Sequence, residues 1–263
     1  MSLGIVIKSP EGIVLAAESR VTLTINGAQG QPSHFVNYDN ATKLFSFCSP
    51  HNHVGVVTYG LAAIGQRTAH SFVTEFESTL PAERLKVFNL AQRISQFYMD
   101  QWRLVMPANY NGPNMTFLVA GFNEGEPYGR VYTMDLPRNT EPTEQQANIN
   151  EFGISWGGQR EIVDRLMQGF DERLIPLIAR EFSFNPEQQQ HLKTILIQNL
   201  QLPLPLNVMA LQDCVNLALL FLRTTIEAQE LTVGVRGCGG PIELAIIKRQ
   251  EAFTYIKHKS IKV

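Results

Sequence analysis

Short apolar runs bounded by turn-forming residues dominate the first sixty positions of the chain and recur in its middle and at its end. Runs of this kind, rich in β-branched and aromatic residues, are typical of β-strands. The predicted strands cover residues 3–8, 13–18, 21–25, 43–48, 54–58, 115–122, 129–135, 152–156, 243–248 and 252–257. Residues 26–42, rich in Gly, Asn, Ser and Pro, are expected to form a loop.

Between these runs, apolar positions recur at the spacing of an α-helix. The predicted helices cover residues 66–78, 82–105, 160–182, 185–199 and 208–228. Asn185-Pro186 is a capping pattern that marks the start of one of them. The order is strands, helices, strands, helices, strands, which favours antiparallel sheets covered by helices over alternating βαβ units. We expect residues 1–263 to form one domain.

Composition and charge exclude several classes of protein. The formal net charge is −2, which gives no sign of binding to nucleic acid or to an acidic membrane. The apolar stretch 215–222 is too short to cross a bilayer. The 3 cysteines are far apart and form no CxxC pair, so we expect neither disulfides nor zinc, and a reduced cytoplasmic protein without a signal peptide.

Two minor motifs carry little functional information. His51 and His53 flank one residue in a turn between predicted strands, and no cluster of further ligands accompanies them, so a metal site is not expected. The glycine-rich stretch 234–240 lacks the Lys-Ser/Thr of a phosphate-binding loop, and we expect a bend where backbones approach closely.

The first strand places a hydroxyl at the second position of the chain. Removal of Met1, which the small residue after it makes plausible, leaves Ser2 with a free α-amine. Such an amine has a pKa of roughly 7.7–8.0, so it can act as a base for its own hydroxyl. A nucleophile of this kind must be anchored in a sheet, which explains a strand that begins at residue 3.

The pairing of the first two strands decides which residues face Ser2. A three-residue turn at 9–11 would put Ser2 opposite Glu18, on the same side of the sheet. A four-residue turn would put Ser2 opposite Ser19 and direct Glu18 away. The sequence leaves both registers open.

Several segments resemble proteasome β-type subunits, which belong to the N-terminal-nucleophile (Ntn) hydrolase superfamily. The similarity runs through IVLAAESRVT, TKLFSF, VGVVTYGLAAIGQRTA and CGGPIELAII, in that order over most of the chain. It implies an α+β fold, a four-layer αββα sandwich of two antiparallel sheets flanked by helices. In this comparison residues 174–207 form a helical insertion.

The resemblance also implies a set of site residues. Ser2 takes the place of the nucleophilic N-terminal threonine, and Glu18 that of an aspartate. Lys43 matches the active-site lysine, Gly60 the glycine whose N–H forms the oxyanion hole, and Arg20 a supporting basic residue. In addition, Thr58 and Ala62 are expected to line the substrate pocket.

The resemblance therefore predicts an amide hydrolase that acts on peptides or proteins without metal or organic cofactor and assembles into a homo-oligomeric ring. Two departures count against activity. Trp156 stands near the position of a supporting serine, and Val235 stands where the family has an aspartate. No propeptide is expected before Ser2. A catalytically inactive, ring-forming structural subunit is the alternative.

Overall fold

Helices and strands alternate in blocks along the part of the chain that the structure describes. The computed structural model describes residues 2–25 and 34–260. Its strands are β1 Leu3–Lys8, β2 Ile13–Ala17, β3 Val21–Ile25, β4 His34–Tyr38, β5 Leu44–Ser46, β6 Val54–Gly60, β7 Ala63–Ile64, β8 Arg67–Thr68, β9 Met115–Gly121, β10 Arg130–Leu136, β11 Asn139–Gln145, β12 Gly153–Gly158, β13 Glu243–Lys248 and β14 Glu251–Lys257. Its helices are η1 Ala69–Phe72, α1 Val73–Glu77, α2 Val87–Val105, α3 Glu161–Gln168, α4 Leu174–Phe182, α5 Pro186–Leu200 and α6 Leu211–Leu231.

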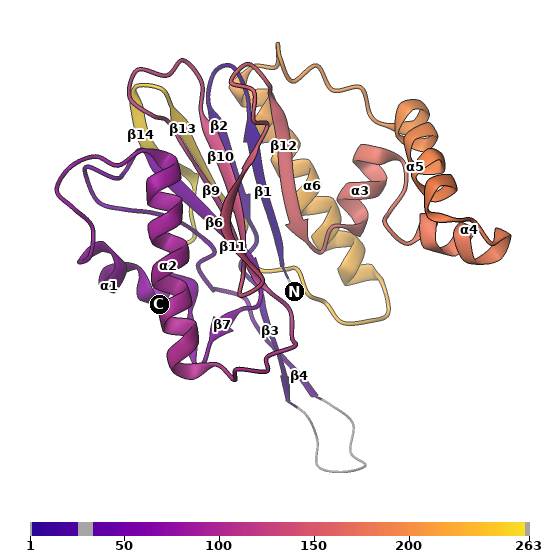
Figure 1. The fold of residues 1–263 in the computed structure, drawn as a ribbon, viewed down its shortest axis with the longest axis horizontal. Helices are drawn as coiled ribbons and strands as arrows, with labels where there is room; N and C mark the ends of the chain where they lie inside the picture. Colours follow the sequence, from indigo (N-terminus) through magenta and orange to yellow (C-terminus); the bar gives the residue numbers. More distant parts are fainter. Residues whose placement is uncertain (1, 26–33, 261–263) are drawn as a thin grey trace.

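The architecture is the predicted four-layer αββα sandwich. One five-stranded antiparallel sheet has the order β12-β1-β2-β13-β14, and the other has the order β11-β10-β9-β6-β5. Helix α6 packs on β1 and β2, whereas α2 packs on β9, β10 and β11. The helices therefore cover the two outer faces, and Figure 1 shows α2 on one side of the paired sheets and α6 with α3 on the other.

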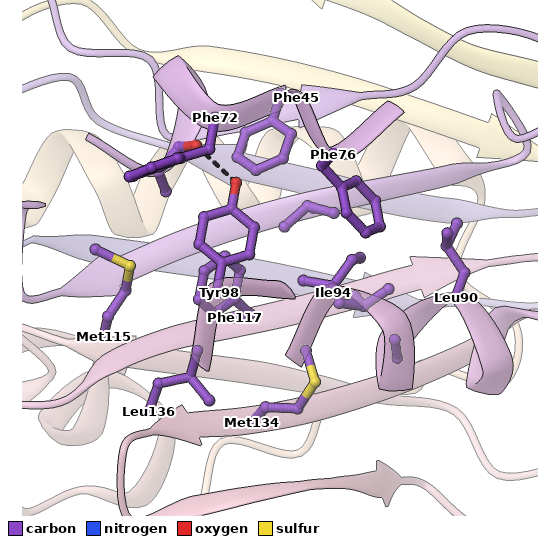
Figure 2. Packing of buried hydrophobic residues seen from close by; sticks show 14 of the residues in the cluster. Phe45, Phe72, Phe76, Leu90, Ile94, Tyr98, Met115, Phe117, Met134 and Leu136 are labelled. Carbon is purple, nitrogen blue, oxygen red and sulfur yellow. Dashed lines mark hydrogen bonds between the residues drawn. The ribbon is translucent and has the colours of Figure 1, made fainter. Parts of the chain in front are cut away.

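Three apolar clusters correspond to the three interfaces between these layers. One lies between α2 and its sheet; in it the buried Tyr98 hydroxyl donates a 2.6 Å hydrogen bond to the carbonyl of Ala69 (Figure 2). A second lies under α6 and α3 and includes Leu3, Ile5 and Phe221. The third lies between the sheets and includes Val6, Leu15 and Val57. Strands β1 and β2 are buried along their whole length, because both faces are covered.

Three predicted helices are broken or shortened. The helix predicted over 160–182 is two helices, α3 and α4, because Gly169 ends α3 in a left-handed conformation with φ +82°. Of the helix predicted over 66–78, only 69–77 is helical, since residues 67–68 form the short strand β8. Helix α2 begins at Val87, whose N–H donates to Asn123 Oδ1, and not at residue 82.

Besides the two-residue strands β7 and β8, two longer strands, β4 and β11, lie where no strand was predicted. Strand β4 falls within the predicted loop 26–42, of which residues 26–33 lie outside the described part of the chain. Strand β11, with the sequence NTEPTEQ, is polar throughout and forms the edge of its sheet. An exposed edge strand has no apolar alternation to reveal it, and Pro142 is tolerated there because one side of such a strand forms no ladder.

The stretch predicted as a helical insertion, 174–207, contains α4 and α5. Asn185 caps α5 as predicted: its side chain accepts from the N–H of Gln188, and the Gln188 side chain accepts from the N–H of Asn185. Both helices extend from the sandwich beside α3 (Figure 1).

Candidate active site

The backbone on both sides of the Ser2 side chain is fixed by hydrogen bonds. The Ser2 carbonyl accepts from Gln159 N–H at 2.7 Å, and the next amide, Leu3 N–H, donates to Glu18 Oε1 at 3.2 Å. Ser2 is only 3% exposed. Gly4 faces Val57 and Tyr59 of the opposite sheet, and strand alternation puts Ser2 on the same side. The hydroxyl-bearing residue therefore lies at the end of β1, toward the space between the sheets.

The register of the β1–β2 hairpin follows the second of the two alternatives. Lys8 pairs with Ile13 and Gly4 with Ala17, so residues 9–12 form a four-residue turn and Ser2 lies at the position opposite Ser19. The three-residue alternative is wrong. The expectation that Glu18 then turns away is also wrong, because β2 ends at Ala17 and strand alternation no longer governs the next residue.

Four donors surround the carboxylate of Glu18, which is fully buried. Oε1 accepts from Leu3 N–H and from Lys43 Nζ at 2.5 Å. Oε2 accepts from the N–H groups of Arg20 at 2.7 Å and Gly239 at 3.1 Å. These four hydrogen bonds offset the loss of hydration that burial of a carboxylate would otherwise cost.

The ammonium group of Lys43 is held at the start of β5. Besides Glu18, it donates to the carbonyl oxygen of Arg20. Its side chain is 7% exposed, so the charge is largely removed from water and fixed in direction. The ion pair and the carbonyl together hold the ammonium in place.

The side chain of Arg20 points away from this ion pair. Its guanidinium makes a bidentate pair with Asp39, at 2.6 and 2.9 Å, and donates to the carbonyl of Cys238. The hydrogen bonds with Arg20 hold the pKa of Asp39 below its usual range and raise the pKa of Arg20. Arg20 therefore reaches Lys43 through its backbone, while its side chain joins the segments around residues 39 and 238.

Gly60 ends β6 in a conformation that suits glycine, with φ +86°. A Cβ at this position would lie 2.2 Å from the carbonyl oxygen of Asn114. Leu61 N–H donates to that same carbonyl at 2.7 Å, which marks residues 61 and 114 as a hydrogen-bonded pair of the ladder. Since such pairs alternate along antiparallel strands, the N–H of Gly60 points away from β9, toward the segment that contains Lys43.

A small cavity brings most of the predicted residues together. Ser2, Lys43, Thr58 and Ala62 all line it. Its volume is about 20 Å³, room for about one water molecule. The remaining lining residues were not predicted: Val21, Ala41, Thr42, Tyr59, Leu61, Thr68 and Ala69. Burial raises the pKa of the Tyr59 phenol to about 12, so this wall of the cavity stays neutral.

Trp156 and Val235 are the two residues that depart from the family pattern, and the structure places both in surroundings of their own. The indole N–H of Trp156 donates to Asp164 Oδ1 at 2.9 Å, and the ring packs in the outer cluster under α6 and α3. Val235 is 38% exposed. In the same glycine-rich stretch, Gly239 donates its N–H to Glu18, and a Cβ on Gly239 would lie 2.3 Å from the Arg20 guanidinium carbon. This stretch supplies a close backbone approach, as predicted.

The histidine pair of the turn has a structural environment. His53 Nδ1 and Nε2 lie within 3.0 and 2.9 Å of the carbonyls of Pro50 and Leu85. Within residues 2–25 and 34–260, no group of three or more His, Cys, Asp or Glu side chains is arranged to hold a metal ion. In the same residues, no helix combines the length and apolarity that a membrane span needs.

Comparison with solved structures shows which known fold this arrangement shares. An Anbu mutant from Hyphomicrobium sp. strain MC1 superimposes with a TM-score of 0.58 at 15% identity, over 98% of this chain and 86% of that one. Anbu, described as an ancestral beta-subunit, from Yersinia bercovieri gives 0.57 at 13% identity, over 98% and 88%. The chain has the fold of Anbu. At these identities the similarity concerns the fold alone.

These comparisons correct the predicted assignment to the proteasome β-subunit-like proteins. No family model matches the chain, and no curated protein matches its sequence. The two solved structures described above share its fold and are Anbu proteins. The proteasome-like Ntn-hydrolase fold stands, whereas the narrower family assignment does not.

Proposed function

We propose that the chain is an N-terminal-nucleophile amide hydrolase in which Ser2, after removal of Met1, attacks a peptide or protein substrate. The observation that carries the proposal is the cavity that Ser2 and Lys43 line together, with the Lys43 ammonium held by the buried carboxylate of Glu18. No lysine or carboxylate would be expected at this depth unless it were paired.

The proposed reaction divides the work among these groups. The Ser2 hydroxyl attacks the substrate carbonyl carbon, and its own α-amine accepts the proton. The nearby Lys43 ammonium disfavours a second positive charge and so keeps that amine neutral. Gly60 N–H, which points toward the Lys43 segment, donates to the oxyanion that forms. The leaving amine takes the proton, and water then hydrolyses the Ser2 acyl ester.

Substrate class, assembly and location belong to the same proposal. Thr58 and Ala62 line the cavity with Ser2, and we assign them to the pocket for a substrate side chain.

We propose a cytoplasmic protein, since Cys48, Cys214 and Cys238 are free thiols. We also propose that it assembles into a homo-oligomeric ring. Native mass spectrometry at micromolar concentration tests the assembly, and a strict monomer would count against it.

Intact mass and turnover together test the hydrolase. We expect the purified protein to lack the mass of Met1 and to hydrolyse members of a fluorogenic peptide panel. Ser2→Ala and Lys43→Ala should each abolish turnover, while Lys257→Ala, an exposed change, leaves it intact. A retained Met1, or equal turnover in wild type and Ser2→Ala, would refute the proposal.

The second candidate is a catalytically silent, ring-forming subunit. The observation that favours it is the size of the cavity beside Ser2, about 20 Å³, which admits no peptide in this conformation. The hydrogen bond from Trp156 to Asp164 favours it as well, because the indole N–H near the position of the family's serine is already engaged. Ring assembly without turnover in wild type or any variant would support this candidate.

A further inference from the structure

The pairing between β5 and β6 stops just before it would reach Gly60. Thr58 N–H donates to the carbonyl of Lys43 at 2.8 Å, and Val57 pairs with Leu44. Each step forward along β6 therefore corresponds to one step backward along the segment that leads into β5. Hydrogen-bonded pairs alternate along an antiparallel ladder. The next such pair would be Gly60 with Ala41, and in it the Gly60 N–H would donate to the Ala41 carbonyl.

Ala41 has other partners, and the ladder ends. Its N–H donates to the carbonyl of Ser19 at 2.9 Å. Its carbonyl accepts from the ammonium of Lys259 at 3.0 Å. Both backbone groups of Ala41 are therefore directed at partners outside β6, and Ala41 instead forms part of the cavity wall beside Ser2.

Lys259 is fixed by more than this one contact. Its ammonium also lies 2.7 Å from Glu243 Oε2 and 3.4 Å from Ser19 Oγ. The Lys259 side chain is 14% exposed and that of Glu243 only 1%, so the ion pair is largely buried. The other oxygen of this carboxylate, Glu243 Oε1, lies 2.6 Å from Nδ1 of His258, the residue before Lys259. Lys259 follows the end of β14 at Lys257 and reaches back to the site from the end of the described chain.

We propose that Lys259 is a positioning residue that keeps the Gly60 N–H available to the oxyanion. By binding the Ala41 carbonyl, it withholds from Gly60 the acceptor that a continued β5–β6 ladder would supply. This inference rests on the proposed function for the role of Gly60. It assigns to the C-terminal tail a part in the site that the sequence does not indicate.

Removing the ammonium should close the ladder. In Lys259→Met the Ala41 carbonyl loses its partner, and its best remaining donor is the Gly60 N–H. Loss of one oxyanion donor lowers kcat by roughly 10²–10³-fold in enzymes where it has been removed. We expect a fall of that order in kcat with little change in KM. Lys259→Arg, which can donate to the same carbonyl, should restore most of it, and Lys257→Met is the matched exposed control.

A measurement that needs no turnover decides the inference independently. In amide hydrogen exchange followed by NMR, the Gly60 N–H should exchange more slowly in Lys259→Met than in wild type, and Lys259→Arg should exchange like wild type. Unchanged Gly60 exchange in a folded Lys259→Met would overturn the inference. Should that variant fail to fold, the double variant Lys259→Met, Glu243→Gln removes the carboxylate that would be left without its counter-charge and serves in its place. Equal turnover in wild type and Ser2→Ala would refute the proposed hydrolase. The exchange experiment would still decide whether Lys259 keeps the Gly60 N–H free of the Ala41 carbonyl.

Discussion

The four donors on Glu18 give a sharp prediction for a substitution that keeps the shape of the side chain and removes its charge. In Glu18→Gln, one carboxylate oxygen becomes an NH₂ group. Oε1 faces Leu3 N–H and Lys43, and Oε2 faces the N–H groups of Arg20 and Gly239. Whichever way the amide turns, two donors face another donor, and the Lys43 ammonium loses its counter-charge.

The expected cost follows from this count. A buried polar group left without its partner costs about 1–3 kcal/mol, and breaking one side of a buried ion pair costs about 3–5 kcal/mol. These figures describe overlapping effects, so we expect a loss of about 3–5 kcal/mol in the free energy of unfolding at pH 7. For a chain of this size, each 1 kcal/mol shifts the melting temperature by about 2–4 °C.

Urea unfolding followed by circular dichroism measures this loss, with Glu181→Gln as an exposed control. The double variant Glu18→Gln, Lys43→Met removes both charges and should recover part of the stability lost in the single variant. A single-variant loss below about 1 kcal/mol, the range of an exposed ion pair, would refute the reasoning.

Three further predictions concern stability. Lys8 is fully buried, and burial lowers its pKa. The unfolded chain therefore binds more protons at this site as pH approaches the ordinary lysine pKa near 10.4, so the contribution of Lys8 to the free energy of unfolding should rise with pH. In urea titrations, Lys8→Met should raise the free energy of unfolding at pH 7, and its advantage over wild type should shrink as pH approaches that value. Burial lowers the pKa of His51 and His53, so the unfolded chain binds protons at a higher pH than the folded chain does. The free energy of unfolding should therefore fall as pH drops below about 6.5, and urea titrations of the double variant His51→Gln, His53→Gln should show a shallower fall. Gly60→Ala should lower the melting temperature more than Gly125→Ala. Both glycines have positive φ, but only at Gly60 does the added Cβ meet a backbone oxygen. Equal shifts of the melting temperature in calorimetry would contradict this.

The strands that could be predicted from the sequence are those whose burial leaves a pattern. β1 and β2 are buried on both faces and appear as continuous apolar runs. β11 is exposed at a sheet edge, and its polar sequence carries no such signal. The break between α3 and α4 depends on one glycine, Gly169, inside an otherwise helical pattern, where a glycine can also be tolerated.

The residues of the candidate site likewise fall into those that the sequence predicts and those that it does not. Ser2 was predicted from its position at the start of a strand as well as from the resemblance, and Lys43, Thr58 and Ala62 from the resemblance; the structure brings all of them to one cavity. The partners that hold the site in shape are backbone groups and distant side chains, such as Gly239 N–H on Glu18 and Lys259 on the Ala41 carbonyl. These two contacts join residues 221 and 218 positions apart in sequence, and the register of the sheets decides them. No local pattern in the sequence encodes that register.

The buried charges at the centre of the site are hard to explain by stability alone. Burying a lysine and a carboxylate together is often no more stabilising than burying two apolar side chains of similar size. Backbone donors from Leu3, Arg20 and Gly239 nevertheless converge on the carboxylate of Glu18. An apolar pair would leave those donors without an acceptor. The carboxylate therefore has a structural role of its own, and it is the ammonium of Lys43, which lines the cavity beside Ser2, that the proposed chemistry accounts for.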